Sequence, residues 1–197
     1  MAQFELRWVR TGIPAAHRAE YLALLSAAER ERYDAAEPAG DSFLAGRVLL
    51  RHLASELTGV PAEDVRIEAA ICRRCERPHG APGIPGSDLR LSLSRCATAI
   101  VAVAAWHRAV GVDVEPRRDD PERDAAIGVV AGVPSLRHWT RVEAVLKADG
   151  SGLTADPGDV RVGRAAARFD GARYRLFEPE VAADLQVSVA VGARKPR

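Results

Sequence analysis

One stretch of the sequence constrains the fold more than any other, namely residues 97–106, which are almost wholly apolar. The run is too short to cross a membrane as a helix, and it predicts a strand that is buried on both of its faces. Residues 89–93 and 110–114 predict strands on either side of it along the chain.

Helical patterns occupy other parts of the chain. Helices are predicted over about 15–34, 41–57 and 138–148. Segments 72–87 and 116–124 are rich in proline, glycine or charged residues and are predicted to be loops. Further strands are predicted at 3–9, 65–71, 160–169, 172–177 and 185–191. Because strands and helices mix without regular βαβ alternation, the predicted fold class is α+β.

Composition limits the kinds of partner. The chain has 197 residues, of which 47% are hydrophobic and 28% charged, and its formal net charge is +1. This balance argues against a disordered chain and against a broad surface for nucleic acid. No membrane span or export signal is recognisable, and an odd number of cysteines, three, fits a reducing compartment. We therefore expect a cytoplasmic protein with no nucleic-acid or membrane partner.

Two carboxylates end one of the predicted strands. Successive strand residues point to opposite faces, so Asp113 and Glu115 share one face. Carboxylate oxygens are the ligands that Mg²⁺ prefers in proteins, and a pair of them at a strand end can hold such an ion. The alternative is a solvated strand end near Arg117 and Arg118.

A second group of candidate residues lies on one face of the last predicted helix. Trp139, Glu143 and Lys147 follow one another at intervals of four. Glu143 could ligate a metal ion, and the compact Lys147 ammonium could meet a bound phosphate. Lys147 and Lys195 are the only lysines, against 26 arginines. The alternative is a helix-stabilising Glu–Lys pair, which contributes only about 0.2–0.5 kcal/mol.

Two further motifs are less specific. Arg47 and Arg51 are spaced to lie side by side on a helix and could bind a phosphate, although chance pairs are expected in a chain so rich in arginine. Cys72 and Cys75 form a C-x-x-C pair that His79 follows. A structural zinc site needs four ligands, so ordinary reduced thiols remain the favoured interpretation.

Taken together and in order, the motifs are those of a known family. They are Phe43-Leu44-Ala45-Gly46-Arg47, the segment from Cys75 to Pro82, Leu91-Ser92-Leu93-Ser94, Gly111-Val112-Asp113-Val114-Glu115, and the segment from Trp139 to Leu153. In this order the chain resembles the 4′-phosphopantetheinyl transferases, in the long, pseudo-dimeric form that activates carrier proteins of polyketide and non-ribosomal peptide synthesis. The resemblance implies a monomer of two α+β halves, 1–108 and 109–197, related by a pseudo-twofold axis with the site in the cleft between them.

The resemblance also implies an activity and a site. The activity is transfer of phosphopantetheine from coenzyme A to a serine of an acyl or peptidyl carrier protein, with Mg²⁺. In the family pattern the metal ligands match Asp113, Glu115 and Glu143. The residues matching coenzyme-binding positions are Arg47, Arg51, Ser94, Arg95 and Lys147, and those matching catalytic positions are Glu143 and Lys147.

Four features depart from the family pattern. Ala81 stands where a basic residue is usual, Arg95 replaces a histidine, Val142 replaces a lysine, and the segment between Asp113 and Trp139 is short. Each lost charged hydrogen bond would cost about 1.5–3 kcal/mol of binding. Two alternative functions therefore stay open: a related enzyme that acts on another small molecule of a specialised-metabolite pathway, and a non-catalytic protein that binds a carrier protein.

Overall fold

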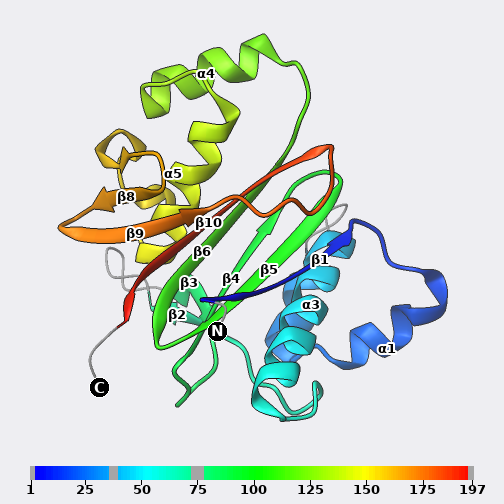
Figure 1. Cartoon of the computed structure of the whole chain (residues 1–197). Coiled ribbons are helices and arrows are strands. Elements are labelled where there is room, and N and C mark those ends of the chain that lie inside the picture. Colours follow the sequence, from blue (N-terminus) through cyan, green and yellow to red (C-terminus); the bar gives the residue numbers. More distant parts are fainter. Residues whose placement is uncertain (1–2, 36–39, 72–77, 195–197) are drawn as a thin grey trace.

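The computed structural model describes residues 3–35, 40–71 and 78–194, which form two antiparallel sheets with helices on their outer faces (Figure 1). The chain up to Trp106 contributes β1 (Glu5–Arg10), η1 (Ala15–His17), α1 (Arg18–Ala23), α2 (Ala27–Asp34), α3 (Gly40–Thr58), β2 (Glu68–Ile71), β3 (Pro78–Gly83), β4 (Leu89–Arg95) and β5 (Ala99–Trp106). The chain from Arg108 contributes β6 (Arg108–Pro116), α4 (Pro121–Ala131), α5 (Leu136–Asp149), η2 (Gly152–Thr154), η3 (Pro157–Asp159), β7 (Arg161–Val162), β8 (Ala166–Phe169), β9 (Ala172–Phe177) and β10 (Leu185–Arg194).

The two sheets have the same strand order. The first runs β1-β5-β4-β3-β2 and the second runs β6-β10-β9-β8-β7. In both, helices lie between the first and second strands along the chain. The predicted α+β class is confirmed, and the strands of the first sheet lie between Glu5 and Trp106 while those of the second lie between Arg108 and Arg194.

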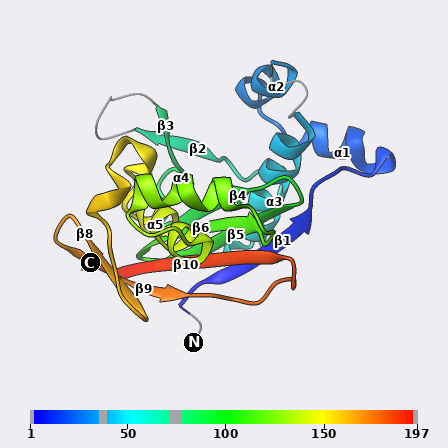
Figure 2. The ribbon, with the colours of Figure 1, turned by 90° about the horizontal axis from the view of Figure 1, so that it is seen from above.

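Four layers pack in the order helix, sheet, sheet, helix (Figures 1 and 2). Val101 and Val103 of β5 face the core between the sheets, whereas Ala102 and Ala104 face α3. On the other side, α5 covers the second sheet. The prediction that residues 97–106 are buried on both faces is confirmed for the strand from Ala99 to Ala105, and Trp106 is exposed.

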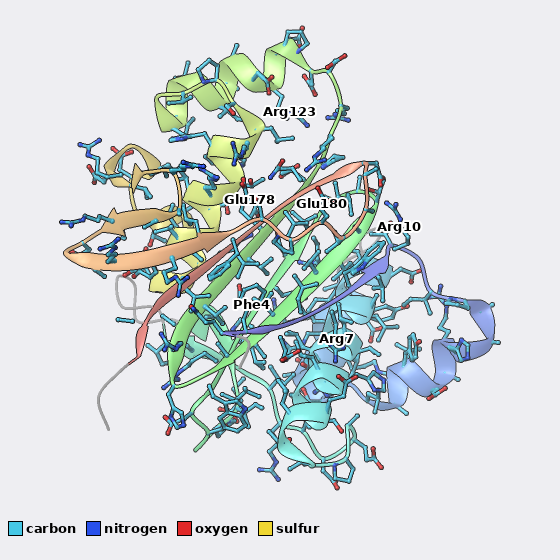
Figure 3. The ribbon with its side chains drawn as sticks, viewed as in Figure 1. Phe4, Arg7, Arg10, Arg123, Glu178 and Glu180 are labelled. Carbon is cyan, nitrogen blue, oxygen red and sulfur yellow. The ribbon has the colours of Figure 1, made fainter. Side chains whose placement is uncertain are left out.

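Two contacts fasten the first strand to the second sheet. The ring of Phe4 packs edge-on against Phe177 at a centroid distance of 5.3 Å. The Arg10 guanidinium donates two hydrogen bonds of 2.8 Å to the carboxylate of Asp184, just before β10. Figure 3 labels Phe4 and Arg10 near the two ends of β1. The first strand is therefore joined to the second half of the chain near both of its ends.

Two predicted elements are divided by local hydrogen bonds. The helix predicted over 15–34 breaks at Ser26, whose hydroxyl accepts from the Glu29 N–H while the Glu29 carboxylate accepts from the Ser26 N–H. This reciprocal capping starts a new helix. The strand predicted over 160–169 is a hairpin of β7 and β8, in which the Gly163 N–H bonds to the Ala166 carbonyl.

Two predicted loops contain regular structure. Segment 116–124 leads into α4, where Asp120 accepts from the Arg123 N–H and Pro121 is the first helical residue. Proline is favoured at that position because its missing N–H is not needed there. Segment 72–87 contains β3, which pairs irregularly with β2 and meets β4 only at Gly83. Its prolines weaken this pairing, since proline donates no backbone hydrogen bond.

The sheets meet where β4 lies beside β6. The hydroxyl of Ser92 accepts from the Val112 N–H at 3.1 Å, and that of Ser94 accepts from the Val114 N–H at 3.3 Å. These side chains satisfy backbone donors on the edge of β6 that faces away from β10. Between β5 and β6 stands a single residue, His107, with φ of 56°.

Gly111 lets α5 lie directly on β6. A Cβ atom at this position would overlap the Ala144 carbonyl and the Ala148 N–H, and would come within 3.0 Å of the Ala148 Cα. Because the backbones approach so closely, side chains on the adjacent positions of β6 and α5 are brought within contact distance.

We expect Gly111→Ala to lower the free energy of unfolding by about 3 kcal/mol or more, because the added methyl forces α5 away from β6. Urea unfolding followed by circular dichroism measures the change. Gly83→Ala is the matched control, since nothing lies within 4 Å of its added Cβ. Equal stability of the two variants would contradict the close packing at Gly111.

Candidate active site

Four residues singled out in the sequence meet where β6 lies against α5. Asp113 and Glu115 come from β6, while Glu143 and Lys147 come from α5. The apolar residues that alternate with the acidic pair on β6 are fully buried in the core between the sheets. The acidic pair therefore faces α5, as strand alternation predicts.

Lys147 is the centre of this group. Its Nζ lies 2.6 Å from Asp113 Oδ1, 3.0 Å from Ser94 Oγ and 3.6 Å from Glu143 Oε2. The Ser94 hydroxyl also donates to Asp113 Oδ1 at 2.8 Å. Ser94 comes from β4, so the group joins residues of both sheets and of α5.

Burial makes this group electrostatically costly. Asp113 is only 4% exposed, and its Oδ2 is buried without a hydrogen-bond partner in the part of the chain that the structure describes. Burial raises the pKa of both Glu115 and Glu143, and the charge of Asp113 raises each further, while Lys147 opposes the rise. Burial acts to lower the pKa of Lys147, but Asp113 and Glu143 outweigh it and the net pKa is raised. Such a crowded set of carboxylates favours an added positive charge.

The donors in this group suit Mg²⁺ in kind, since they are carboxylate oxygens and one of them has no hydrogen-bond partner among the described residues. Their present arrangement does not form a ready metal centre. Over residues 3–35, 40–71 and 78–194, no three His, Cys, Asp or Glu side chains lie together closely enough to hold an ion. Lys147 instead occupies the place between Asp113 and Glu143. The assignment of Asp113, Glu115 and Glu143 as metal ligands therefore stays a prediction.

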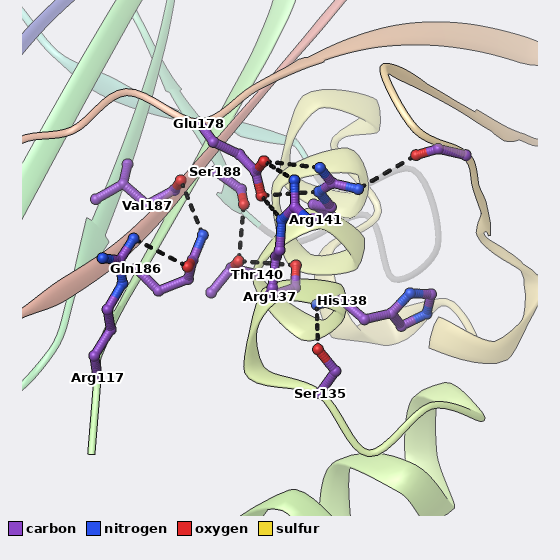
Figure 4. A network of polar contacts seen from close by, with 11 residues as sticks. Arg117, Ser135, Arg137, His138, Thr140, Arg141, Glu178, Gln186, Val187 and Ser188 are labelled. Carbon is purple, nitrogen blue, oxygen red and sulfur yellow. Dashed lines mark hydrogen bonds and ion pairs between the residues drawn. The ribbon is translucent and has the colours of Figure 1, made fainter. Parts of the chain in front are cut away.

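A second network joins α5 to β10 and to the segment before β10 (Figure 4). Arg137 and Arg141 both donate to the carboxylate of Glu178, at distances of 2.5 to 3.0 Å. The pKa of Glu178 is lowered to about 2 by these hydrogen bonds. The buried hydroxyls of Thr140 and Ser188 lie 2.8 Å apart between α5 and β10. These contacts hold the helix in place against β10 and the segment that precedes it.

A cavity of about 920 Å³ lies next to the carboxylate group, between the two halves. Its lining comes from segments 80–83, 107–110, 147–150 and 170–174, among others. Lys147 takes part in both the cavity wall and the carboxylate group. Ala81, at one of the departures from the family pattern, lines the cavity without adding a charge.

Arg47 and Arg51 both bind the carboxylate of Glu29, which was not among the residues predicted from the sequence. The Arg51 guanidinium donates two hydrogen bonds to Glu29, at 3.3 and 2.6 Å. Arg47 donates to the same carboxylate and, at 2.9 Å, to the Ile67 carbonyl. Burial acts to raise the pKa of Glu29, yet Arg51, Ser26 and Arg47 lower it overall. A ligand phosphate would have to compete with Glu29 for this arginine pair.

Val142 and Arg95, two further departures from the family pattern, both lie away from the carboxylate group. Val142 is fully buried in the core between α5 and the second sheet, so a lysine there would bury a charge. Arg95 follows Ser94 on β4 and points to the opposite face. Burial lowers the pKa of Arg95, and the positive charge of Arg32 lowers it further. The structure thus joins Ser94 to the carboxylate group and places Arg95 near Arg32.

The sequence contained signals for some of the residues that were missed. Ser26 and Glu29 form the S-x-x-E pattern of a capping box, which could have located the start of α2. No sequence pattern indicates that Glu29 reaches α3. Cys72 and Cys75 lie outside the described residues, as does the side chain of His79, so the possible zinc motif stays untested.

The protein has an α+β fold with two sheets of the same strand order. Its candidate site consists of carboxylates near Lys147, two of which contact the lysine directly. The chain matches no model of a known protein family and no curated protein. Within the described residues, every helix is too short or too polar to cross a membrane.

We expect Glu29→Gln to destabilise the protein by about 3–5 kcal/mol at neutral pH, because it leaves two largely buried guanidinium groups without their carboxylate. The pKa of Glu29 is lowered on folding, so its contribution is present above the ordinary glutamate pKa and disappears as the pH falls. Urea unfolding at several pH values checks both points. Glu31→Gln, at an exposed position of the same helix, is the control.

We expect Glu115→Gln to stabilise the protein at neutral pH, by less than about 1 kcal/mol because water screens a group that is only partly buried. The folded-state pKa of Glu115 is raised, so the wild-type protein loses stability as the pH rises through that value. The advantage of the variant should therefore vanish below the ordinary glutamate pKa. Thermal unfolding across this pH range measures it, and a variant that is less stable at neutral pH would contradict the raised pKa.

Proposed function

We propose that the protein is a 4′-phosphopantetheinyl transferase-like enzyme that moves phosphopantetheine from coenzyme A to a carrier-protein serine. One observation carries the proposal. Asp113 of β6 and Glu143 of α5 both contact Lys147 beside a cavity, and one buried oxygen of Asp113 has no described partner. The sequence motifs that supply these residues are those that resemble the transferase family.

The residues have distinct roles in this proposal. Asp113, Glu115 and Glu143 would hold Mg²⁺, which neutralises charge on a bound pyrophosphate. Lys147 places an ammonium beside the phosphate and stabilises negative charge on the leaving group. Ser94 holds Asp113 and Lys147 in position through its hydroxyl. The attacking serine hydroxyl comes from the carrier protein, and adenosine 3′,5′-bisphosphate leaves.

The finer features of the architecture belong to the same proposal. The equal strand order of the two sheets supports two halves related by a pseudo-twofold axis, with their boundary near residue 108. Both halves are present in one chain, so a monomer would contain the whole cleft. The reaction places the enzyme in the cytoplasm, where coenzyme A and carrier proteins are available.

One observation favours a second candidate, a related protein that binds a different small molecule. Glu29 neutralises part of the charge of Arg47 and Arg51, the pair expected to bind a phosphate of coenzyme A. A ligand without that phosphate would leave this contact undisturbed. A non-catalytic binder of carrier proteins would bind its partner without turnover and would tolerate loss of Asp113.

Transfer is tested by incubating the protein with coenzyme A, Mg²⁺ and a panel of apo carrier proteins. We expect at least one carrier protein to gain the mass of one phosphopantetheine group, as measured by mass spectrometry. Asp113→Asn and Glu143→Gln should each reduce the rate by about a hundredfold or more, because charge stabilisation in the transition state is lost.

Glu122→Gln, at an exposed position on α4, is the control and should leave the rate unchanged. A complete panel without any mass gain would overturn the proposal. Transfer that survives both substitutions, or that needs no divalent ion, would contradict the roles assigned to Asp113 and Glu143.

A further inference from the structure

Arginines stand opposite one another across three strands of the second sheet. The strand register places Arg161 of β7 opposite Arg168 of β8, and Arg168 opposite Arg173 of β9. Residues that pair directly across antiparallel strands share a face, so the three side chains form one line, which we call the arginine row. All three residues are exposed. The sheet therefore presents a line of three positive charges to its surroundings.

The row lies on a part of the second sheet that the first sheet leaves uncovered. Arg175, two residues after Arg173, pairs with Val191 of β10, which packs in the core between the sheets. On the opposite face of the same strands, Phe169 and Tyr174 pack in the core cluster that includes α5. Figures 1 and 2 show β8 and β9 on the opposite side of the molecule from α1. A partner can therefore approach the row without displacing a described helix or strand.

No described carboxylate neutralises the row. Elsewhere an exposed arginine such as Arg7 pairs with an acidic residue, Glu56, at 2.8 Å. Over residues 3–35, 40–71 and 78–194, none of the three arginines forms an ion pair, even with Asp170 in the turn between β8 and β9. Arg161 donates to the Gly158 carbonyl at 3.2 Å, which leaves its charge uncompensated.

Such a line of like charges costs stability. Like charges that stand directly opposite on neighbouring strands repel each other, and the row contains two such contacts, Arg161 with Arg168 and Arg168 with Arg173. Destabilising features of this kind are commonly kept where a protein binds or reacts. The row therefore indicates a surface for an anionic partner, whose charge would be complementary.

The spacing of the row favours one kind of anion. Neighbouring strands lie about 4.7–4.9 Å apart, so successive arginines of the row repeat at nearly that interval. Side chains four residues apart on an α-helix have Cβ atoms about 5–6 Å apart, which is almost the same interval. Acidic side chains one helical turn apart can therefore each meet one guanidinium, in the bidentate geometry that arginine and carboxylate favour.

We propose that the arginine row binds a protein partner through a helix that carries three acidic side chains one turn apart. The helix lies across β7, β8 and β9, with one carboxylate on each of Arg161, Arg168 and Arg173. Arg173 also contributes to the lining of the cavity, so the bound partner lies beside the cavity. This inference does not depend on the proposed function, because it rests on the charge and the register of the strands.

Binding of a designed peptide to the wild-type protein tests the inference. The aligned peptide is a stapled, alanine-rich helix of about 20 residues with three glutamates at intervals of four. The reference peptide has the same composition, with its glutamates spread around the helix. Fluorescence anisotropy at low salt should show at least about tenfold tighter binding of the aligned peptide, because only this peptide meets all three arginines at once.

Arg168→Gln removes the centre of the row and should weaken binding of the aligned peptide about fivefold, as expected for loss of an exposed ion pair. Arg66→Gln is the matched control, since Arg66 is also an exposed arginine and lies outside the row. This control removes the same net charge and should leave the affinity unchanged.

Equal affinity for the two peptides, or no binding of either, would overturn the inference. A uridine tetranucleotide carries the same three negative charges, and its tighter binding than the aligned peptide would overturn the inference in favour of a nucleic acid. Displacement of the aligned peptide by adenosine 3′,5′-bisphosphate would overturn it as well, because Arg173 would then belong to the ligand of the cavity.

Thermal unfolding of the same variants tests whether the row costs stability. Arg168→Gln should raise the unfolding midpoint by about 1–3 °C at low salt, because two contacts between like charges are removed. The gain should shrink at high salt, which screens exposed charges. Arg66→Gln should leave the midpoint unchanged. An Arg168→Gln protein that is less stable than the wild type would contradict the uncompensated charge and overturn the inference.

Discussion

The structure depends on the close approach of α5 to β6. Gly111 has no Cβ atom, and a Cβ at this position would overlap the backbone of α5. As a result Lys147, on α5, reaches Asp113, on the adjacent strand, at hydrogen-bond distance. The same approach buries Asp113 and raises the pKa of Glu143. A single glycine therefore permits both the close packing of α5 on β6 and the contacts of the candidate site.

Charge compensation in this site is incomplete. Lys147 is one ammonium in contact with two carboxylates, and a buried oxygen of Asp113 remains without a described partner. Such an arrangement costs stability, which the rest of α5 offsets through the Arg141–Glu178 ion pair and the buried Thr140–Ser188 contact. Sites that bind or react commonly carry unfavourable electrostatics of this kind. The network around Glu178 and Ser188 thus helps to hold α5 in place beside the acidic group.

Sequence patterns predicted the fold where local periodicity controls the structure. The strand at 172–177 has the predicted bounds, and same-face alternation correctly placed Asp113 and Glu115 against α5. The prediction of a loop over 116–124 was wrong at its end, because proline is common both in loops and at the first position of a helix. Pro121 begins α4. Glu29 could not be assigned because its partners are 18 and 22 residues away on another helix. Tertiary contacts of this kind have no local signature.

The connection between β5 and β6 has a consequence for how the cleft forms. His107 alone separates the two strands, and its backbone N–H is bonded to the Asp88 carbonyl. So short a tether keeps each sheet at a very high effective concentration near the other. Assembly of the cleft is therefore intramolecular, and its completeness does not depend on how dilute the protein is. Two separate chains would have to find each other first, and would lose the site on dilution.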